Sequence, residues 1–191
     1  MTHLVFAPCP KPEAVSLCSA WHSRLPNVQK GPWQFAFAAC LPDGTPVAVA
    51  LWNNPSARTL PGHWLELRRM ACSPEAPPNT ASMFLGWMHR WFSAEHPHRE
   101  KLISYQDTAV HTGTIYKAAG WQIEYTSAPR VRDRSPKRVG TDRQYRSDMN
   151  GQAPAASAKN RWSKMLKPKR QQRKGLRTTP GPTLQQQEIE A

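Results

Sequence analysis

Residues 65–121, LELRRMACSPEAPPNTASMFLGWMHRWFSAEHPHREKLISYQDTAVHTGTIYKAAGW, decide the fold. Alternation of apolar and polar residues predicts a strand at 64–71, three prolines then interrupt the chain, and a 3.6-residue period predicts a helix to about Glu95. A second strand at 101–106 follows, and then a short helix that Gly120 ends. Because a helix begins directly after a strand ends, this region is suited to binding an anion.

Arg69 is the unusual residue of the first strand. Strict alternation would place it on the face that carries Leu65 and Leu67, although a core does not accept an uncompensated cation. A β-bulge would turn its side chain to the other face, and bulges are common near active sites. The alternative is a surface arginine whose aliphatic stem lies along an edge strand.

The helix after the prolines has an apolar body and a polar start. Apolar residues at three- and four-residue spacing predict one buried face, made of Phe84, Trp87, Met88, Trp91 and Phe92. Asn79 or Thr80 is expected to supply an N-cap oxygen, and the small first turn through Ser82 leaves backbone N–H groups accessible. We therefore expect Asn79, Thr80 and Ser82 to bind the phosphate or carboxylate of a cofactor.

Three residues capable of proton chemistry follow the second strand. Asp107 can accept a proton, His111 can act as an acid or a base, and Tyr116 can donate a proton or a hydrogen bond. Each also has a structural explanation, as a turn former, a loop residue and a helix-packing residue, and Thr112 is expected to cap the short helix. Their proximity beside a strand end supports the functional interpretation as strongly as the structural one.

Four segments of this region resemble the Mom family of bacteriophage proteins: Glu66–Met70, Asn79–Ser82, Ser104–Thr108 and His111–Tyr116. The order of strands and helices also resembles the second half of the GNAT N-acyltransferase fold. The resemblance covers roughly residues 20–125. It implies a transferase that adds a carbamoylmethyl group to the exocyclic nitrogen of adenine in DNA.

By position, the resemblance implies functional roles for Arg69, Ser82, Asp107 and Tyr116, with His22 as a weaker match. Arg69 and the helix start would hold an anionic donor, Asp107 would orient or deprotonate the nucleophile, and Tyr116 would act as the acid.

The donor is not identified by the sequence. GNAT enzymes bind pyrophosphate on a glycine-rich loop, whereas this chain has Pro77 and Pro78, which lack N–H donors. This difference predicts weak binding of acetyl-coenzyme A and leaves an acyl-coenzyme A or another small carboxylate-type donor open. A metal bound by His22, Asp107 or His111 is compatible with the sequence, but their spacing does not require one.

The N-terminal part completes an α+β domain. Residues 1–8 predict a strand, 14–25 a helix, and 33–52 a hairpin that turns at a Pro-Asp-Gly sequence. A hairpin followed by a mixed strand–helix half indicates a GNAT-like mixed sheet flanked by helices. We assign residues 1–125 to this transferase domain and 126–191 to a C-terminal extension.

The net charge of +13 lies mostly in the extension. Residues 1–125 carry 10 Lys/Arg against 8 Asp/Glu, a net of +2, and residues 126–191 carry 16 against 5, a net of +11. The extension has too few apolar residues for a second core, so we expect it to be largely disordered, with Trp162 and Leu166 attaching one segment to the domain. Removing residues 151–191 should then leave the melting temperature of the core unchanged.

A basic arm of this kind suits double-stranded DNA, because lysines and arginines near phosphates release counterions whatever the sequence. The expected phosphate contacts are Arg130, Arg132, Arg134, Lys137, Arg138, Lys164, Lys167, Lys169 and Arg170. The alternative is an ordinary solubilising tail.

Other features narrow the class of protein. No apolar run approaches the length of a membrane span and no signal peptide begins the chain, so we expect a cytoplasmic protein, in the bacterial host if a phage encodes it. The four cysteines lack the spacing of a zinc site or a disulfide framework. Trp33, Trp52 and Trp64 are either core residues or surfaces on which a flipped base could stack.

Two further functions remain open. One is an ordinary GNAT N-acetyltransferase that acts on a small amine or a protein. The other is a non-catalytic DNA-binding protein that retains only the fold, in which case Asp107 and Tyr116 would be dispensable.

Overall fold

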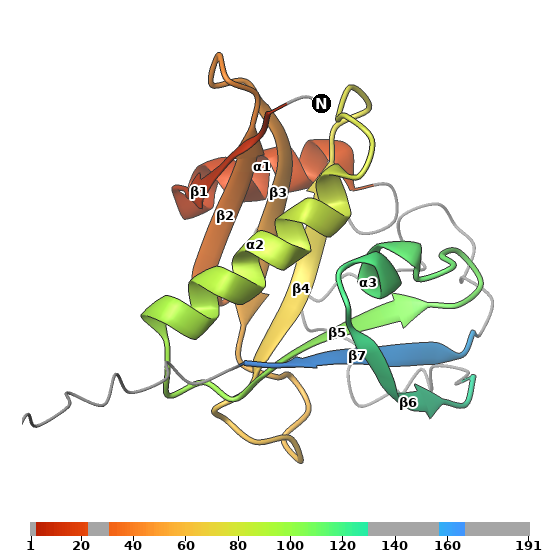
Figure 1. Ribbon diagram of the computed structural model, residues 1–191. Coiled ribbons are helices and arrows are strands. Elements are labelled where there is room, and N and C mark those ends of the chain that lie inside the picture. The colour runs from red at the N-terminus through yellow and green to blue at the C-terminus, as the bar shows by residue number, and fades with distance from the viewer. Residues whose placement is uncertain (1–2, 23–30, 130–156, 167–191) are drawn as a thin grey trace, which may run out of the picture.

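The computed structural model describes residues 3–22, 31–129 and 157–166. Its centre is a seven-stranded mixed sheet of order β1-β2-β3-β4-β5-β7-β6 (Figure 1). Helix α1 packs on one face of this sheet, and helices α2 and α3 pack on the other. The predicted α+β fold, a mixed sheet flanked by helices, is confirmed.

The N-terminal half is antiparallel throughout. Its elements are β1 (Val5–Pro8), α1 (Lys11–Trp21), β2 (Phe35–Cys40), β3 (Pro46–Asn53) and β4 (Leu65–Cys72). The interiors of β2 and β3 are buried on both faces, which explains their continuous apolar sequences. Between them Gly44 adopts a φ of 89° and the Asp43 carboxylate accepts a hydrogen bond from the Thr45 N–H, as the predicted turn requires.

Strand β4 contains the bulge that would turn Arg69 to the other face. Arg69 lies opposite Leu51 and Leu67 opposite Trp52, so Arg68 is the extra residue between them. Leu67 therefore faces the core under α2, whereas Arg69 faces the α1 side of the sheet, where Leu51 packs.

Helix α2 (Thr80–Glu95) buries its predicted apolar face. Phe84, Met88 and Phe92 are fully buried, and Trp87 and Trp91 pack beside them. The expected N-cap hydrogen bond is absent. Asn79 occupies the cap position in the left-handed region, at a φ of 66°, and its side chain makes no capping bond. A turn closed by the hydrogen bond from the Thr80 N–H to the Pro77 carbonyl leads the chain into the helix.

Strand β5 (Lys101–Asp107) is parallel to β4 but pairs with it only from Leu102 to Ser104, so the two strands diverge beyond Ser104. Helix α3 (Thr114–Ala118) follows. Its N-cap is Gly113, at a φ of 77°, and not the predicted Thr112. Gly120, at a φ of 70°, comes just after the helix, as expected.

Two strands end the described chain, β6 (Gln122–Ser127) and β7 (Lys159–Met165). Strand β7 lies between β5 and β6 and is antiparallel to both. Trp162 and Leu166 are buried, with 2% and 6% of their surfaces exposed. They attach this segment to the domain, as expected.

The expected division of the chain at residue 125 is wrong, because residues 159–165 of the extension form β7, which lies in the sheet between β5 and the edge strand β6. Lys164 belongs to β7, where its ammonium group donates to the carbonyl of Ala119. Deleting residues 151–191 would remove that strand and would not leave an intact core. The other expected phosphate contacts lie outside the described residues: Arg130, Arg132, Arg134, Lys137, Arg138, Lys167, Lys169 and Arg170. No helix in the described ranges is long and apolar enough to cross a membrane.

Candidate functional site

A cavity of about 260 Å³ lies where β4 ends and α2 begins. Its wall is formed by the loop after β4, the first turn of α2 and one side of α3. Asn79, Thr80 and Ser82 all line it, so the structure brings together the three residues expected to bind a cofactor. Thr114 and Ile115 of α3 close the opposite wall.

The first turn of α2 presents a positive end to this cavity. Thr80 uses its N–H and its hydroxyl to bond the Pro77 carbonyl, at 3.2 and 2.6 Å. The Ser82 hydroxyl donates to the Asn79 carbonyl at 3.0 Å. The N–H groups of a first helical turn have no acceptor within the helix, and this turn contains no acidic residue to offset its dipole. An anionic group is therefore favoured here.

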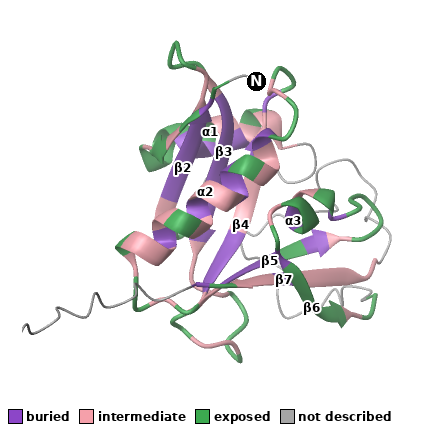
Figure 2. Cartoon of the chain, viewed as in Figure 1, coloured by how far each residue is buried: buried purple, intermediate pink, exposed green. Residues whose placement is uncertain are grey.

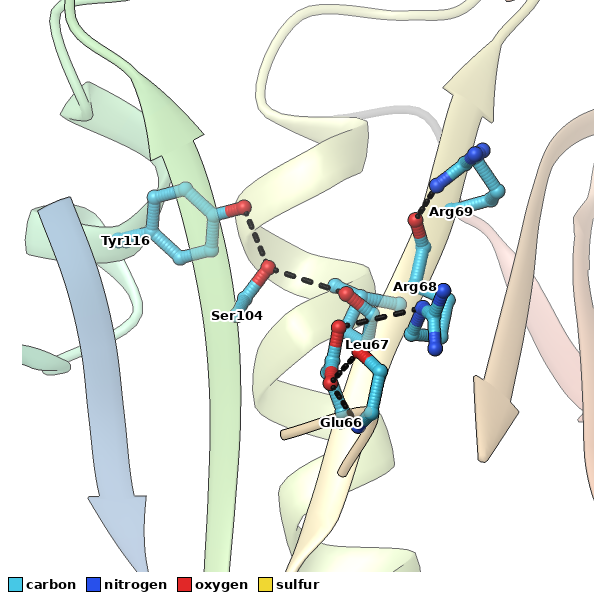
Figure 3. Close-up of polar contacts among 7 residues, drawn as sticks. Glu66, Leu67, Arg68, Arg69, Ser104 and Tyr116 are labelled. Atoms are coloured by element: carbon cyan, nitrogen blue, oxygen red, sulfur yellow. Dashed lines mark hydrogen bonds and ion pairs between the residues drawn. The ribbon is translucent and has the colours of Figure 1, made fainter. Parts of the chain in front are cut away.

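Tyr116 belongs to α3, the helix that forms one wall of the cavity, and its hydroxyl lies where β4 and β5 diverge. Its hydroxyl is 2.9 Å from the Ser104 hydroxyl, which is 3.3 Å from the Leu67 carbonyl (Figure 3). A carbonyl can only accept, so Ser104 donates to Leu67 and Tyr116 donates to Ser104. The Tyr116 proton is thus held by Ser104.

Burial raises the pKa of Tyr116 above its ordinary value, and the Ser104 hydrogen bond lowers it by a smaller amount. The ring is held between two tryptophans. It stacks on Trp162 of β7 at 5.3 Å between centroids and meets Trp121 edge-on at 5.7 Å. The phenol is consequently neutral and fixed in position at physiological pH.

Gln106 joins β5, β7 and the loop before α3. Its side-chain oxygen accepts a hydrogen bond from the Trp162 indole at 2.6 Å, and its amide donates to the His111 carbonyl. Neither Gln106 nor Trp162 was a predicted site residue. Gln106 could have been suspected, since alternation places this amide on the apolar face of a strand.

Asp107 and Arg69 lie on the α1 side of the sheet and not beside Tyr116. Asp107 alternates with Gln106 on β5, and the bulge turns Arg69 away from Leu67. Asp107 Oδ1 accepts from the Ala109 N–H at 3.1 Å and from the Ser157 hydroxyl at 2.7 Å. The Arg69 guanidinium donates to the Arg68 carbonyl at 2.6 Å (Figure 3). The turn-forming role proposed as the alternative for Asp107 is therefore real.

Glu66 is a buried carboxylate that the sequence interpretation missed. It accepts hydrogen bonds from the N–H and hydroxyl of Ser56, at 2.8 and 3.0 Å, and pairs with Arg68 at 3.2 Å. These contacts tie the loop between β3 and β4 to the sheet. A glutamate between two leucines was the signal that could have revealed it.

The remaining candidates are not assembled with Tyr116. His22 is the residue that ends α1, and His111 is exposed in the loop after β5. Within the described ranges, no three His, Cys, Asp or Glu side chains lie close enough to hold a metal ion. Trp52, a suggested stacking surface, is fully buried in the core.

Comparison with known proteins agrees with this architecture. The Mom protein family matches residues 3–177 of the chain. No protein of curated function matches the sequence.

Three acetyltransferase structures are similar to this chain. The ribosomal-protein-S5-alanine acetyltransferase of Vibrio fischeri has a TM-score of 0.55 at 10% identity, with 87% of this chain and 94% of that chain covered. A Bacillus subtilis acetyltransferase in complex with CoA gives 0.54 at 11% identity, over 87% and 99%. The Escherichia coli ribosomal-protein-S18-alanine N-acetyltransferase gives 0.54 at 8% identity, over 86% and 94%. The TM-scores, over most of each chain, show that this chain has a GNAT-like fold.

Proposed function

The chain belongs to the Mom protein family, and from that premise we propose that it modifies adenine in double-stranded DNA by adding a carbamoylmethyl group to the exocyclic amine. The observation that carries the proposal is the cavity formed by the polar start of α2 and closed by α3, the helix that holds the buried and neutral Tyr116. This arrangement combines a candidate anion site with a proton donor on the helix that closes it. A less specific function, that of a GNAT-like transferase with an unknown acceptor, would require the same cavity and the same tyrosine.

The two faces of the sheet suggest how donor and acceptor meet. The donor would occupy the cavity on the α2 and α3 side, with its anionic group at Asn79, Thr80 and Ser82. The adenine would approach from the α1 side, where Arg69 and Asp107 lie. Transfer would take place where β4 and β5 diverge beyond Ser104, since the two strands are not paired there.

Arg69, Asp107 and Tyr116 then have separate roles. Asp107 would accept the proton that the exocyclic amine loses when it attacks the donor. Tyr116 would protonate the departing group once its O–H turns from Ser104. Arg69 would orient the phosphate or base on the acceptor side through its guanidinium. Because the target nitrogen is paired inside a duplex, the adenine must first leave the stack.

The substitution Asp107→Asn tests this proposal. An asparagine oxygen can keep both hydrogen bonds that Asp107 Oδ1 accepts, from Ala109 and Ser157, so the turn should survive while the base is removed. We expect an unchanged melting temperature and a fall of about 100-fold or more in modified adenine. Mass spectrometry of nucleosides from expressing cells measures this fall.

Asp107→Ala is the matched control, because it removes the charge and the two hydrogen bonds together. It should also lower the free energy of unfolding, by about 1 kcal/mol for each hydrogen bond removed. Near-normal modified adenine in the Asn variant would reduce Asp107 to a turn residue. No modified adenine with the unchanged chain would refute the proposed function.

A further inference from the structure

Exposed apolar residues are concentrated at the β6 end of the strand order, in β5, β6, β7 and the loop after β5. In the part of the chain that the structure describes, five of the seven large exposed hydrophobic residues belong to this end: Tyr105, Val110, Ile123, Tyr125 and Met165. Strand β6 is exposed at every residue from Gln122 to Thr126 (Figure 2). A wholly exposed edge strand is a hazard for aggregation that proteins avoid unless the surface has a use.

Two of these residues, Tyr105 and Tyr125, form an ordered group with Arg161. Tyr105 of β5 lies opposite Arg161 of β7, and Arg161 lies opposite Tyr125 of β6. Directly opposed residues of antiparallel strands point to the same face. We call Tyr105, Arg161 and Tyr125 the tyrosine face. It lies on the α1 side of the sheet, because Ser104 and Gln106, which alternate with Tyr105, point to the α3 side.

The group is held in place but is still open to solvent. The Arg161 guanidinium lies 5.3 Å from the centre of the Tyr125 ring and 3.3 Å from the Glu124 carboxylate, which also pairs with Lys101 at 2.7 Å. Tyr105 is 39% exposed and Tyr125 is 49% exposed. A tyrosine ring held beside an arginine, with a second exposed tyrosine on the same face, forms a surface on which flat groups can stack.

We propose that the tyrosine face binds DNA by stacking an unpaired or extruded base on Tyr105 and Tyr125. Nucleobases stack on tyrosine rings and arginine planes whatever their sequence. The charge of the chain favours a polyanion over a protein partner. Residues 130–138, with five Lys/Arg, follow β6 directly, and Lys167, Lys169 and Arg170 follow β7.

This inference rests on the proposed function and names the surface that would receive the acceptor. Arg69 and Asp107 lie on the same side of the sheet as the tyrosine face. A base drawn out of the duplex would therefore find its stacking surface on the side from which it must approach the transfer site.

The experiment compares the full chain with a Tyr105→Ala, Tyr125→Ala double variant. Binding is measured by fluorescence anisotropy on three labelled DNAs: a fully paired duplex, the same duplex with one unpaired adenine, and its single strand. Because stacking of one base on an aromatic ring is typically worth tenfold in affinity or more, we expect roughly tenfold weaker binding to the two DNAs with unpaired bases. Binding to the paired duplex, held mainly by phosphates, should weaken by less than about threefold, with the same salt dependence.

Two variants serve as controls. Tyr105→Phe with Tyr125→Phe keeps the rings and should bind as the unchanged chain does, which separates stacking from the loss of hydroxyl groups. Val5→Ala removes an exposed apolar side chain from β1, the opposite edge of the sheet, and should change nothing. Melting temperatures show whether every variant is folded, and if the alanine pair unfolds, Tyr125→Ala alone is measured.

Affinity of the alanine variant equal to that of the unchanged chain on all three DNAs would overturn the inference. So would a change from oligomer to monomer in sedimentation, because the face would then join two copies of this chain. Modified adenine in expressing cells is measured separately. If the unchanged chain modifies no adenine but loses DNA affinity with the two tyrosines, the proposed function fails and the tyrosine face stands.

Discussion

The hydrogen bond between Tyr116 and Ser104 determines how the buried phenol can act. The Ser104 proton is directed to the Leu67 carbonyl, so the Tyr116 proton is committed to Ser104 until one of these bonds is broken. Ser104 is therefore a positioning residue for Tyr116. The sequence contained no signal for this role, because a serine in the middle of a strand usually has no specific contact that a sequence pattern could reveal.

We predict that Ser104→Ala raises the pKa of Tyr116 further. The Ser104 hydroxyl lowers that pKa because it can turn from the Leu67 carbonyl and donate to the phenolate once the phenolate forms, so its removal leaves burial as the dominant influence. Ultraviolet difference titration of the unchanged chain and the variant measures the change, and Tyr116→Phe identifies which tyrosine signal belongs to position 116. A Tyr116 pKa that stays the same in Ser104→Ala would mean that the hydroxyl contact does not influence the phenol.

Stability at high pH should depend on the same phenol. The pKa of Tyr116 is higher in the folded state than in the unfolded state, where it is about 10. The difference therefore contributes its full stabilisation below pH 10, and this contribution is lost as the pH rises through the folded-state pKa. We predict that the free energy of unfolding falls above about pH 10 less steeply in Tyr116→Phe than in the unchanged chain. Denaturant melts across that pH range measure both slopes, and equal slopes would contradict the prediction.

Strand β7 shows why part of the fold could not be predicted from the sequence. Its sequence, Lys-Asn-Arg-Trp-Ser-Lys-Met, has the composition of a basic tail, and only Trp162 among its residues is buried. The strand is stable because both of its edges are paired and because Trp162 contacts Tyr116 and Gln106. Such long-range pairing leaves little local pattern. The regular apolar spacing of α2, in contrast, identified that helix and its buried face.

The contact between α3 and β7 can be tested at Gly113. A Cβ atom at this position would lie 2.6 Å from the Trp162 ring and 2.8 Å from the Gln106 side-chain oxygen, and the φ of 77° already disfavours other residues. We predict that Gly113→Ala destabilises the fold by about 2–4 kcal/mol, from backbone strain and the clash together. Chemical denaturation measures this cost.

Gly44→Ala is the matched control for that substitution. Gly44 has a similar φ of 89°, but nothing lies within 4 Å of the added Cβ. Its cost should be backbone strain alone, about 1 kcal/mol. Equal destabilisation by the two substitutions would show that Gly113 does not depend on its contact with Trp162.

The whole molecule combines a nearly neutral N-terminal part with a basic C-terminal region. The middle of that region, residues 159–165, forms β7, the strand next to the edge strand β6. The charge distribution was predictable from composition, because it requires only a count of residues. The path of the chain was not, since it depends on β7 inserting between β5 and β6. Basic residues precede and follow β7 in the sequence, so the DNA binding that we propose would be linked to the fold through this strand.

That linkage makes the position of a truncation decisive. Deleting residues 167–191 removes six Lys/Arg and two Glu, a net charge of +4, and keeps Leu166, whose N–H donates to the Glu100 carbonyl at 2.8 Å. We predict an unchanged melting temperature and weaker DNA binding. The slope of log affinity against log salt concentration should become shallower by about 0.9 for each phosphate that the deleted residues neutralised.

Deleting residues 159–191 also removes β7 and should unfold the domain, because Tyr116 and Gln106 no longer pack on Trp162. Titrations at several salt concentrations and thermal melts distinguish these results. If the shorter deletion leaves the salt dependence unchanged, residues 167–191 do not bind phosphates, and the electrostatic attraction must come from the basic residues between β6 and β7.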